Sequence, residues 1–278
     1  MKIAIASGKG GTGKTTIALN LALSLENVQL MDCDVENPNC HLFLAKSLEE
    51  VEPVNLRVPV IDKAICTNCG KCGDFCRYNA LVTFKQDTLF FPEMCHGCGG
   101  CTLVCPENAI SEVLRPIGKI YRASVGNLDF WSGLLNIGEP MATPVIKRLK
   151  SHLDETKTTI LDSPPGTACP VIETMNGADF VILVTEPTPF GLHDLKLAVE
   201  VVRILDIPFG VIVNRVGVGD NRVQEYCKAQ SIKILLEIPQ DRHIASLYSD
   251  GISFVLEMPE WKGRFISLFE AIKSEVGK

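Results

Sequence analysis

Eight of the twelve cysteines fall into two short runs with the same spacing. Each run reads C-x2-C-x2-C-x3-C: Cys66, Cys69, Cys72 and Cys76 in the first, and Cys95, Cys98, Cys101 and Cys105 in the second. Thiolates at these short steps are typical ligands of [4Fe–4S] clusters, and a proline follows the last cysteine of the second run, as in the bacterial pattern. The spacing therefore predicts two [4Fe–4S] clusters.

Crossed ligation is usual for this pattern, because the fourth cysteine of each run binds the other cluster. The predicted ligand groups are Cys66, Cys69, Cys72 and Cys105 for one cluster, and Cys95, Cys98, Cys101 and Cys76 for the other. Structural zinc is the alternative, since paired C-x2-C motifs also bind zinc. Zinc takes four ligands per ion, however, and leaves the third cysteine at the same step unexplained.

A glycine-rich segment predicts a nucleotide site. It reads G-K-G-G-T-G-K-T over residues 8–15, follows an apolar stretch at residues 2–6 and precedes a helical pattern. Glycines let backbone N–H groups turn toward phosphates, Lys14 reaches the β and γ oxygens, and the Thr15 hydroxyl ligates Mg²⁺. The segment therefore predicts ATP or ADP binding with Mg²⁺ by a run of neighbouring residues: Gly8, Lys9, Gly10, Gly11, Thr12, Gly13, Lys14, Thr15 and Thr16.

Apolar strands alternate with helical patterns along most of the chain, which predicts an α/β fold with a mainly parallel sheet covered on both faces. The alternation stops between residues 59 and 116, where the segment 76–81 is echoed by 105–110. This internal repeat indicates an inserted α+β ferredoxin-like module, with the clusters acting as its core. We therefore expect a discontinuous ATPase domain, residues 1–58 and 117–278, with the insert at 59–116.

Composition narrows the possible partners and location. The net charge of −6 argues against nonspecific nucleic-acid binding. No apolar run reaches membrane-spanning length, and the sequence opens on a core strand, so we expect a cytoplasmic protein whose cysteines bind metal in a reducing compartment. An apolar stripe over residues 261–276 fits either a membrane-binding helix or a docked final helix; the nearly balanced flanking charges favour the docked helix.

Lys9 is a residue that an ordinary P-loop does not need. With it, the loop resembles the deviant Walker A group, which includes the MinD and ParA ATPases, the Mrp-type cluster carriers and the nitrogenase iron protein. In that group the residue matching Lys9 crosses a dimer interface to the partner's nucleotide, so the resemblance implies a homodimer with ATP sandwiched at the interface. The whole chain resembles MinD-superfamily ATPases with an inserted ferredoxin domain.

The same resemblance implies roles for residues at strand ends. The run I-L-D-S-P-P-G-T at 160–167 is similar to the family's Walker B and switch II segment. It implies that Asp162 holds Mg²⁺ and that the Gly166 N–H lies near the γ-phosphate. Asp34 matches the switch I aspartate, which positions the attacking water. The implied catalytic residues are Lys9, Lys14, Asp34 and Asp162.

The resemblance also implies an adenine site. Asn214 and Arg215 are similar to the family's base-reading pair, because the Asn214 amide can donate to and accept from a purine edge. Pro239 resembles the loop that closes over the base.

Four cysteines lie outside the two runs. Cys169 stands seven residues after Asp162, the offset at which the nitrogenase iron protein has an interface cluster ligand. That similarity implies an interface thiol able to share metal across a dimer; the alternative is a small buried thiol near a helix start. Cys33, Cys40 and Cys227 are expected to pack inside the protein; for Cys40 the alternative is a thiol that senses the nucleotide state.

These observations favour an ATP-dependent iron–sulfur protein in which a nucleotide-driven change of the dimer gates electron transfer to an unidentified redox partner. One alternative is a carrier that hands clusters to an apo-protein, as Mrp-type relatives are thought to do. Those carriers use a C-x-x-C near the C-terminal part of the ATPase domain, which this sequence lacks. The other alternative, a MinD-like or ParA-like positioning ATPase with a redox-sensing insert, needs a membrane or DNA surface that the charge pattern does not match.

Overall fold

The computed structural model describes residues 1–44 and 47–277. Its main sheet has nine strands in the order β11-β10-β9-β1-β8-β2-β7-β6-β3. The strands from β11 to β7 run parallel, as pairs such as β1 with β8 and β2 with β7 show. These strands are β1 (Lys2–Ala6), β2 (Val28–Asp32), β7 (Leu128–Leu135), β8 (Thr158–Asp162), β9 (Phe180–Thr185), β10 (Phe209–Val216) and β11 (Ile234–Pro239).

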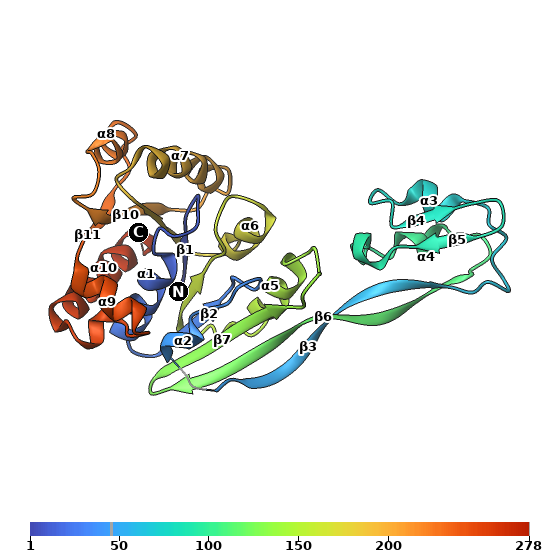
Figure 1. Ribbon diagram of the computed structural model, residues 1–278, viewed down its shortest axis with the longest axis horizontal. Helices are drawn as coiled ribbons and strands as arrows, with labels where there is room; N and C mark the ends of the chain where they lie inside the picture. The colour runs from blue at the N-terminus through green and yellow to red at the C-terminus, as the bar shows by residue number, and fades with distance from the viewer. Residues whose placement is uncertain (45–46, 278) are drawn as a thin grey trace.

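Helices cover both faces of this sheet (Figure 1). Side chains alternate across a strand, so Ile3 and Ile5 of β1 pack on one face while Ala4 and Ala6 pack on the other. The isoleucine face is covered by α1 (Lys14–Ser24), α2 (His41–Leu44), α9 (Arg242–Ser249), η2 (Phe254–Leu256) and α10 (Pro259–Val276). The alanine face is covered by α5 (Thr143–Lys150), α6 (Cys169–Met175), α7 (Pro189–Ile204) and α8 (Arg222–Ala229). The predicted α/β architecture is confirmed.

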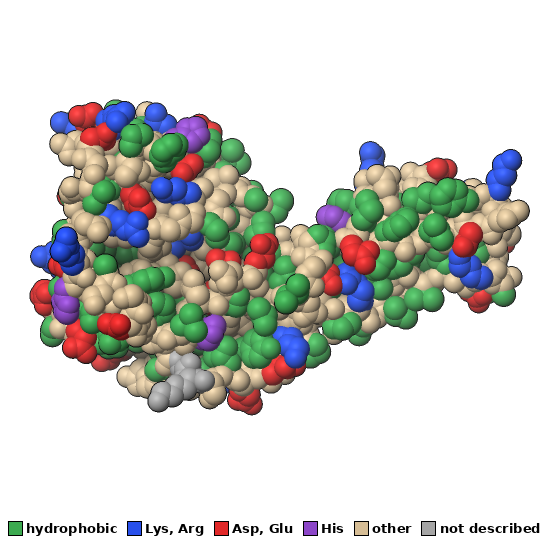
Figure 2. All heavy atoms as spheres, in the orientation of Figure 1, with side chains coloured by type: hydrophobic (Ala, Val, Ile, Leu, Met, Phe, Trp, Pro, Cys, Tyr) green, Lys and Arg blue, Asp and Glu red, His purple; other side chains and the backbone are tan. Residues whose placement is uncertain are grey.

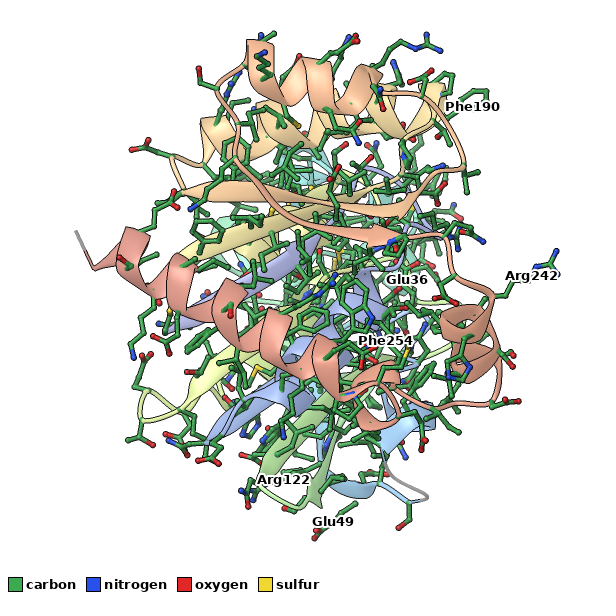
Figure 3. The ribbon with its side chains drawn as sticks, turned by 90° about the vertical axis from the view of Figure 1, so that its left-hand side faces the viewer. Glu36, Glu49, Arg122, Phe190, Arg242 and Phe254 are labelled. Atoms are coloured by element: carbon green, nitrogen blue, oxygen red, sulfur yellow. The ribbon has the colours of Figure 1, made fainter. Side chains whose placement is uncertain are left out.

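The last helix is docked on this body. Figure 3, in which the left-hand side of Figure 1 faces the viewer, shows α10 lying across the body with Phe254 beside the end where the helix begins. Phe254 meets the ring of Trp261 edge-on, with centroids 5.5 Å apart, and Phe265 is fully buried. The expectation of a docked helix is confirmed. Within the described residues, none of the helices is long and apolar enough to cross a membrane.

Two long antiparallel strands leave the sheet edge. β3 (Glu49–Ile61) pairs with β6 (Ile110–Val125) over its whole length, but β6 pairs with β7 only from Gly118 onward. The part of β6 before Gly118 pairs with β3 alone, and these two strands form a ribbon that carries residues 62–109 away from the body (Figures 1 and 2). The predicted boundaries of the insert fall inside β3 and β6, and its independence as a domain stays a prediction.

Residues 62–109 form a small lobe at the end of the ribbon. It contains α3 (Lys71–Phe75), β4 (Leu81–Thr83), β5 (Thr88–Phe90), η1 (Pro92–Met94) and α4 (Gly100–Val104). The internal repeat of the sequence returns in the backbone, since Asn79 and Asn108 both adopt left-handed conformations with φ of 53° and 52°. The buried cluster inside this lobe is small, with Cys72 and Leu81 packed against Ile110 at the start of β6, so little apolar surface holds the lobe together.

Candidate nucleotide site and cysteine groups

A cleft of about 640 Å³ opens where the P-loop meets the ends of the parallel strands. Ligands of open α/β sheets bind beyond the carboxyl ends of the strands, and this volume falls in the usual range for small-molecule sites. The predicted nucleotide residues that line it are Gly10, Gly11, Gly13, Lys14, Thr15, Thr16, Asp34, Asn214, Arg215 and Pro239. Gly8, Lys9, Thr12, Asp162 and Gly166 lie outside its lining.

Gly13 marks the point where the loop becomes α1. Its φ is +97°, and a Cβ atom there would lie 2.4 Å from Nδ2 of Asn214, so a side chain is excluded. Nδ2 of Asn214 donates to the carbonyl of Thr12 at 2.9 Å, and its Oδ1 accepts from the Arg215 N–H at 3.0 Å. Asn214 therefore holds the P-loop in this structure. The base-reading role stays a prediction that requires its amide to turn.

Two buried carboxylates meet where neighbouring strands end. Asp32 of β2 is directly opposite Asp162 of β8 in the strand register. Oδ2 of Asp32 accepts from the N–H groups of Asn39 and Cys40, both at 2.9 Å. The Cys40 thiol donates to Oδ2 of Asp162 at 3.4 Å. Ligand atoms of Asp32, Cys40 and Asp162 thus lie within 4.8 Å of one another.

This cluster carries unbalanced charge. Burial raises the pKa of Asp32 to about 8, and the neighbouring charge of Asp162 adds to the shift. Burial also raises the pKa of Asp162 to about 6, against the opposing effects of the Thr15 hydroxyl and the Lys14 ammonium group. Oδ1 of Asp162 is buried without a hydrogen-bond partner in the described structure. A divalent cation fits these properties, because it would give Oδ1 a partner and favour both ionised carboxylates.

Lys14 and Asp34 lie beside this cluster. Burial lowers the pKa of Lys14, while the negative charges of Asp162 and Asp34 oppose the shift. Burial raises the pKa of Asp34, opposed chiefly by Lys14. Gly166 is in the left-handed region with φ of +97°, and its N–H donates to the carbonyl of Ser7 at 3.1 Å. Its predicted approach to a γ-phosphate would require that bond to break.

Lys9 is held within its own chain. Its Nζ lies 3.8 Å from Oε2 of Glu186, and the Arg215 guanidinium donates to Oε1 of the same carboxylate at 3.0 Å. The Glu186 side chain is only 13% exposed, so it sits against two cations at the rim of the cleft. Sequence reasoning gave Glu186 no role. Its position directly after β9, at the ligand-binding edge of the sheet, was the available signal.

The lobe brings its eight cysteines together in two groups. One cavity is lined by Cys76, Cys95, Cys98 and Cys101, and a second by Cys66, Cys69, Cys72 and Cys105. These are the groups that crossed ligation requires, with the fourth cysteine of each run facing the other set. All eight are free thiols.

The distances between thiols bear on the metal. A tetrahedral zinc ion with Zn–S bonds of about 2.3 Å holds its sulfurs within about 4 Å of one another. In the described part of the chain, the acidic cluster of Asp32, Cys40 and Asp162 is the only group of three ligands found within 4.8 Å. Neither cysteine group is therefore as compact in this structure as a zinc site would be. Backbone N–H groups of Gly97 and Ala109 already donate to sulfur, at 3.4 Å to Cys95 and 3.3 Å to Cys105.

Cys169 is the first residue of α6, and its side chain is exposed. The interpretation as a buried thiol is therefore wrong, although its place at a helix start is confirmed. Cys33, Cys40 and Cys227 are buried, as expected.

A glycine-rich loop between β1 and α1 of a mainly parallel sheet defines a P-loop nucleotide-binding protein with a MinD-like fold. The chain belongs to the CobQ/CobB/MinD/ParA nucleotide binding domain family, which it matches over residues 3–254.

Similar proteins agree with this assignment. Two uncharacterised proteins of Methanocaldococcus jannaschii are 33% and 34% identical, over 92% and 91% of this chain and 91% and 89% of their own lengths. An iron–sulfur cluster carrier protein of Pyrococcus horikoshii is 24% identical over 100% of this chain and 89% of its own. Among solved structures, the septum site-determining protein MinD of P. horikoshii, complexed with Mg-ADP, has a TM-score of 0.59 at 24% identity, covering 99% of this chain and 97% of that chain.

Proposed function

We propose that this protein hydrolyses ATP as a homodimer and uses the resulting conformational change to gate electron transfer through two [4Fe–4S] clusters to a redox partner. The observation that carries the proposal is the β3–β6 ribbon. It joins the cysteine lobe to the ATPase sheet through two continuous paired strands, and β6 enters the sheet beside β7. Such a connection transmits movement, whereas a flexible linker would not.

The nucleotide chemistry follows from the buried charges. Lys14 would meet the β and γ oxygens of ATP, which relieves the cost of burying its ammonium group. Asp162 and Thr15 would hold Mg²⁺ at the unpartnered Oδ1. Asp34, adjacent to Lys14, would orient the attacking water.

Dimerisation would complete the site. Lys9 lies outside the cleft lining, and its Nζ is 3.8 Å from Oε2 of Glu186, which does line the cleft. To reach the nucleotide of a second copy it would leave this carboxylate, which then remains paired with Arg215. Adenine would be bound by Asn214, Arg215 and Pro239, which line the same cleft.

The two cysteine groups would hold the clusters, which supply one-electron chemistry at potentials set by charge, hydrogen bonds to sulfur and solvent access. The protein contributes fixed N–H donors to Cys95 and Cys105. Of the ligands, Cys69 and Cys98 are exposed, one in each group. Each group therefore has a surface at which a redox partner could approach.

A cluster or metallocofactor carrier is the second candidate. The exposed Cys169 at the start of α6 favours it, as does the similarity to proteins named iron–sulfur cluster carriers. A carrier releases its cluster to an apo-protein, whereas gated electron transfer requires that the clusters stay bound.

Retention of iron during turnover separates the two functions. After anaerobic reconstitution with labelled iron, we expect about eight iron atoms per chain. During ATP hydrolysis in the presence of an apo-ferredoxin, the proposed function predicts that this label stays with the protein. Transfer of label that depends on ATP and is lost in Cys169→Ser would establish the carrier function instead.

A further inference from the structure

Arg115 lies on the ribbon between the ATPase body and the lobe, and it contacts both. Its guanidinium forms a bidentate ion pair with Glu139, with Nη2 donating to Oε2 at 2.9 Å. The same Nη2 donates to the carbonyl of Pro92 in η1 at 3.4 Å. Glu139 belongs to the loop between β7 and α5, so the Arg115 side chain links that loop to the lobe.

The lobe contact leads directly to one cysteine group. The carbonyl of Pro92 also accepts from the N–H of Cys95, at 3.2 Å. Arg115 is paired with Leu56 across the ribbon. A Cβ on Gly97 would lie only 2.6 Å from the Leu56 side chain, so Leu56 packs directly against Gly97. The Arg115 guanidinium therefore lies next to the start of the loop that begins with Cys95.

The body contact leads back to the nucleotide site. The N–H of Leu135, at the end of β7, donates at 2.8 Å to the carbonyl of Val35, the residue after Asp34. A Cβ on Gly133 would lie 2.7 Å from Cγ1 of Val35, so the Val35 side chain packs directly on the Gly133 backbone. Asn136 comes directly after Leu135, and its carbonyl accepts from the Glu139 N–H at 3.1 Å. Movement of the segment after Asp34 thus acts on the loop that carries Glu139.

Burial makes the ion pair sensitive to such movement. The Arg115 and Glu139 side chains are 24% and 14% exposed, so their charges are only partly screened by water. Nε of Arg115 is buried and has no partner in the described structure. The guanidinium consequently has one more hydrogen bond to make if its neighbours shift.

We infer that Arg115 and Glu139 are positioning residues that couple the nucleotide site to the cysteine group of Cys76, Cys95, Cys98 and Cys101, and to that group in preference to the other. The inference rests on the proposed function and adds how its gating works. Reduction adds negative charge to a cluster, so a nearby uncompensated cation favours the reduced form. When the segment after Asp34 moves, Glu139 screens Arg115 differently, and the reduction potential of this one cluster changes.

The test is a redox titration of the reconstituted protein followed by EPR, without nucleotide and with a non-hydrolysable ATP analogue. Cys98→Ser identifies which signal belongs to the Cys95 group. Glu139→Gln should raise the potential of this cluster and Arg115→Gln should lower it, with the other cluster unchanged. Both variants should lose the nucleotide-induced shift while binding the analogue as tightly as the wild type. Arg115→Lys keeps the positive charge, so it should lower the reduction potential of this cluster less than Arg115→Gln does.

Glu50→Gln is the matched control. Glu50 of β3 pairs with Lys119 of β6 at 2.7 Å, where β6 has already joined β7 in the sheet, and both side chains are more than two-fifths exposed. Glu50→Gln should retain the wild-type reduction potentials and the shift that the ATP analogue induces. If the ATP analogue shifts the reduction potential equally in the wild type and in Glu139→Gln, the inferred coupling through Arg115 is wrong and the proposed function stands. If the wild type does not shift at all, the gating function and this inference are both overturned.

Discussion

The thiol of Cys40 donates a hydrogen bond to Oδ2 of Asp162 across 3.4 Å. This contact ties the segment after β2 to the end of β8, in the place where we propose that Mg²⁺ binds. It also gives the buried Asp162 carboxylate its described side-chain partner, since Oδ1 has none. Cys40 therefore adds to the effects of the Thr15 hydroxyl and the Lys14 ammonium group in stabilising this buried acid.

Replacing Cys40 should destabilise the nucleotide-free protein. Cys40→Ala leaves a buried carboxylate oxygen unpaired, which costs about 1–3 kcal/mol, and Cys40→Ser should lose less because it keeps a donor. Urea unfolding measures the difference. Cys227→Ala is the control, because that buried thiol lies in α8, away from the carboxylates. Equal losses for Cys40→Ala and Cys227→Ala would show that the hydrogen bond contributes nothing beyond volume.

The pKa of Asp32 predicts a pH dependence. Burial raises it from 3.8 to about 8, so the folded protein binds a proton that the unfolded chain has lost. The sign follows from linkage: stability falls as pH rises from about 4 to about 8. Asp32→Asn removes this group, and its stability in urea should exceed that of the wild type by more than about 1 kcal/mol at pH 8 but not at pH 4. An identical pH dependence for the two proteins would contradict the assignment.

Lys14→Ala should abolish ATP hydrolysis, because Lys14 is the buried cation of the P-loop. The cysteine groups lie on the lobe at the other end of the ribbon, so iron content and the EPR spectrum without nucleotide should match the wild type. Steady-state phosphate release and iron analysis measure the two properties. Loss of iron in Lys14→Ala would mean that cluster binding and nucleotide binding are not separable.

Glu186→Gln should make dimerisation easier. Lys9 contacts Glu186 at 3.8 Å and must leave it to reach a partner's nucleotide. A partly exposed pair of this kind is worth up to about 1 kcal/mol, and each dimer breaks two of them, so the dissociation constant of the dimer with an ATP analogue should fall by up to about thirtyfold.

Analytical ultracentrifugation provides the measurement for this variant, and Glu173→Gln is its control. Glu173 also lies 3.8 Å from a lysine, Lys147, and its side chain is similarly buried, but the pair joins α6 to α5. Weaker dimerisation of Glu186→Gln than of Glu173→Gln would contradict a holding role for Glu186.

Local patterns predicted much of this structure. Strand and helix periodicity is set by nearest neighbours in the chain, so the α/β body and the docked α10 followed from the sequence. The grouping of Cys76 with the second run could also be expected, because it follows from a spacing rule. Side-chain pairs between distant segments could not be predicted from such local patterns. Arg215 and Glu186 are 29 residues apart and Arg115 and Glu139 are 24 apart, and only tertiary packing brings them together.

Exposure was likewise hard to predict for single residues. Cys169 reads as a small apolar residue at a helix start, yet it faces outward because α6 places Val171, Thr174 and Met175 against the sheet instead. Asn214 carries the amide expected of a base reader, but its amide is used to hold Thr12. Both cases depend on how an element is turned against its neighbours, which periodicity over seven or eight residues defines poorly.

The most direct test of gated electron transfer is the reduction potential of the reconstituted wild-type protein, measured anaerobically by EPR with no nucleotide, with ADP and with a non-hydrolysable ATP analogue. The account predicts that the analogue shifts the potential of at least one cluster while the iron content stays constant. Spectra and potentials that are the same in all three states would contradict it, and would leave the clusters with a structural or sensory role.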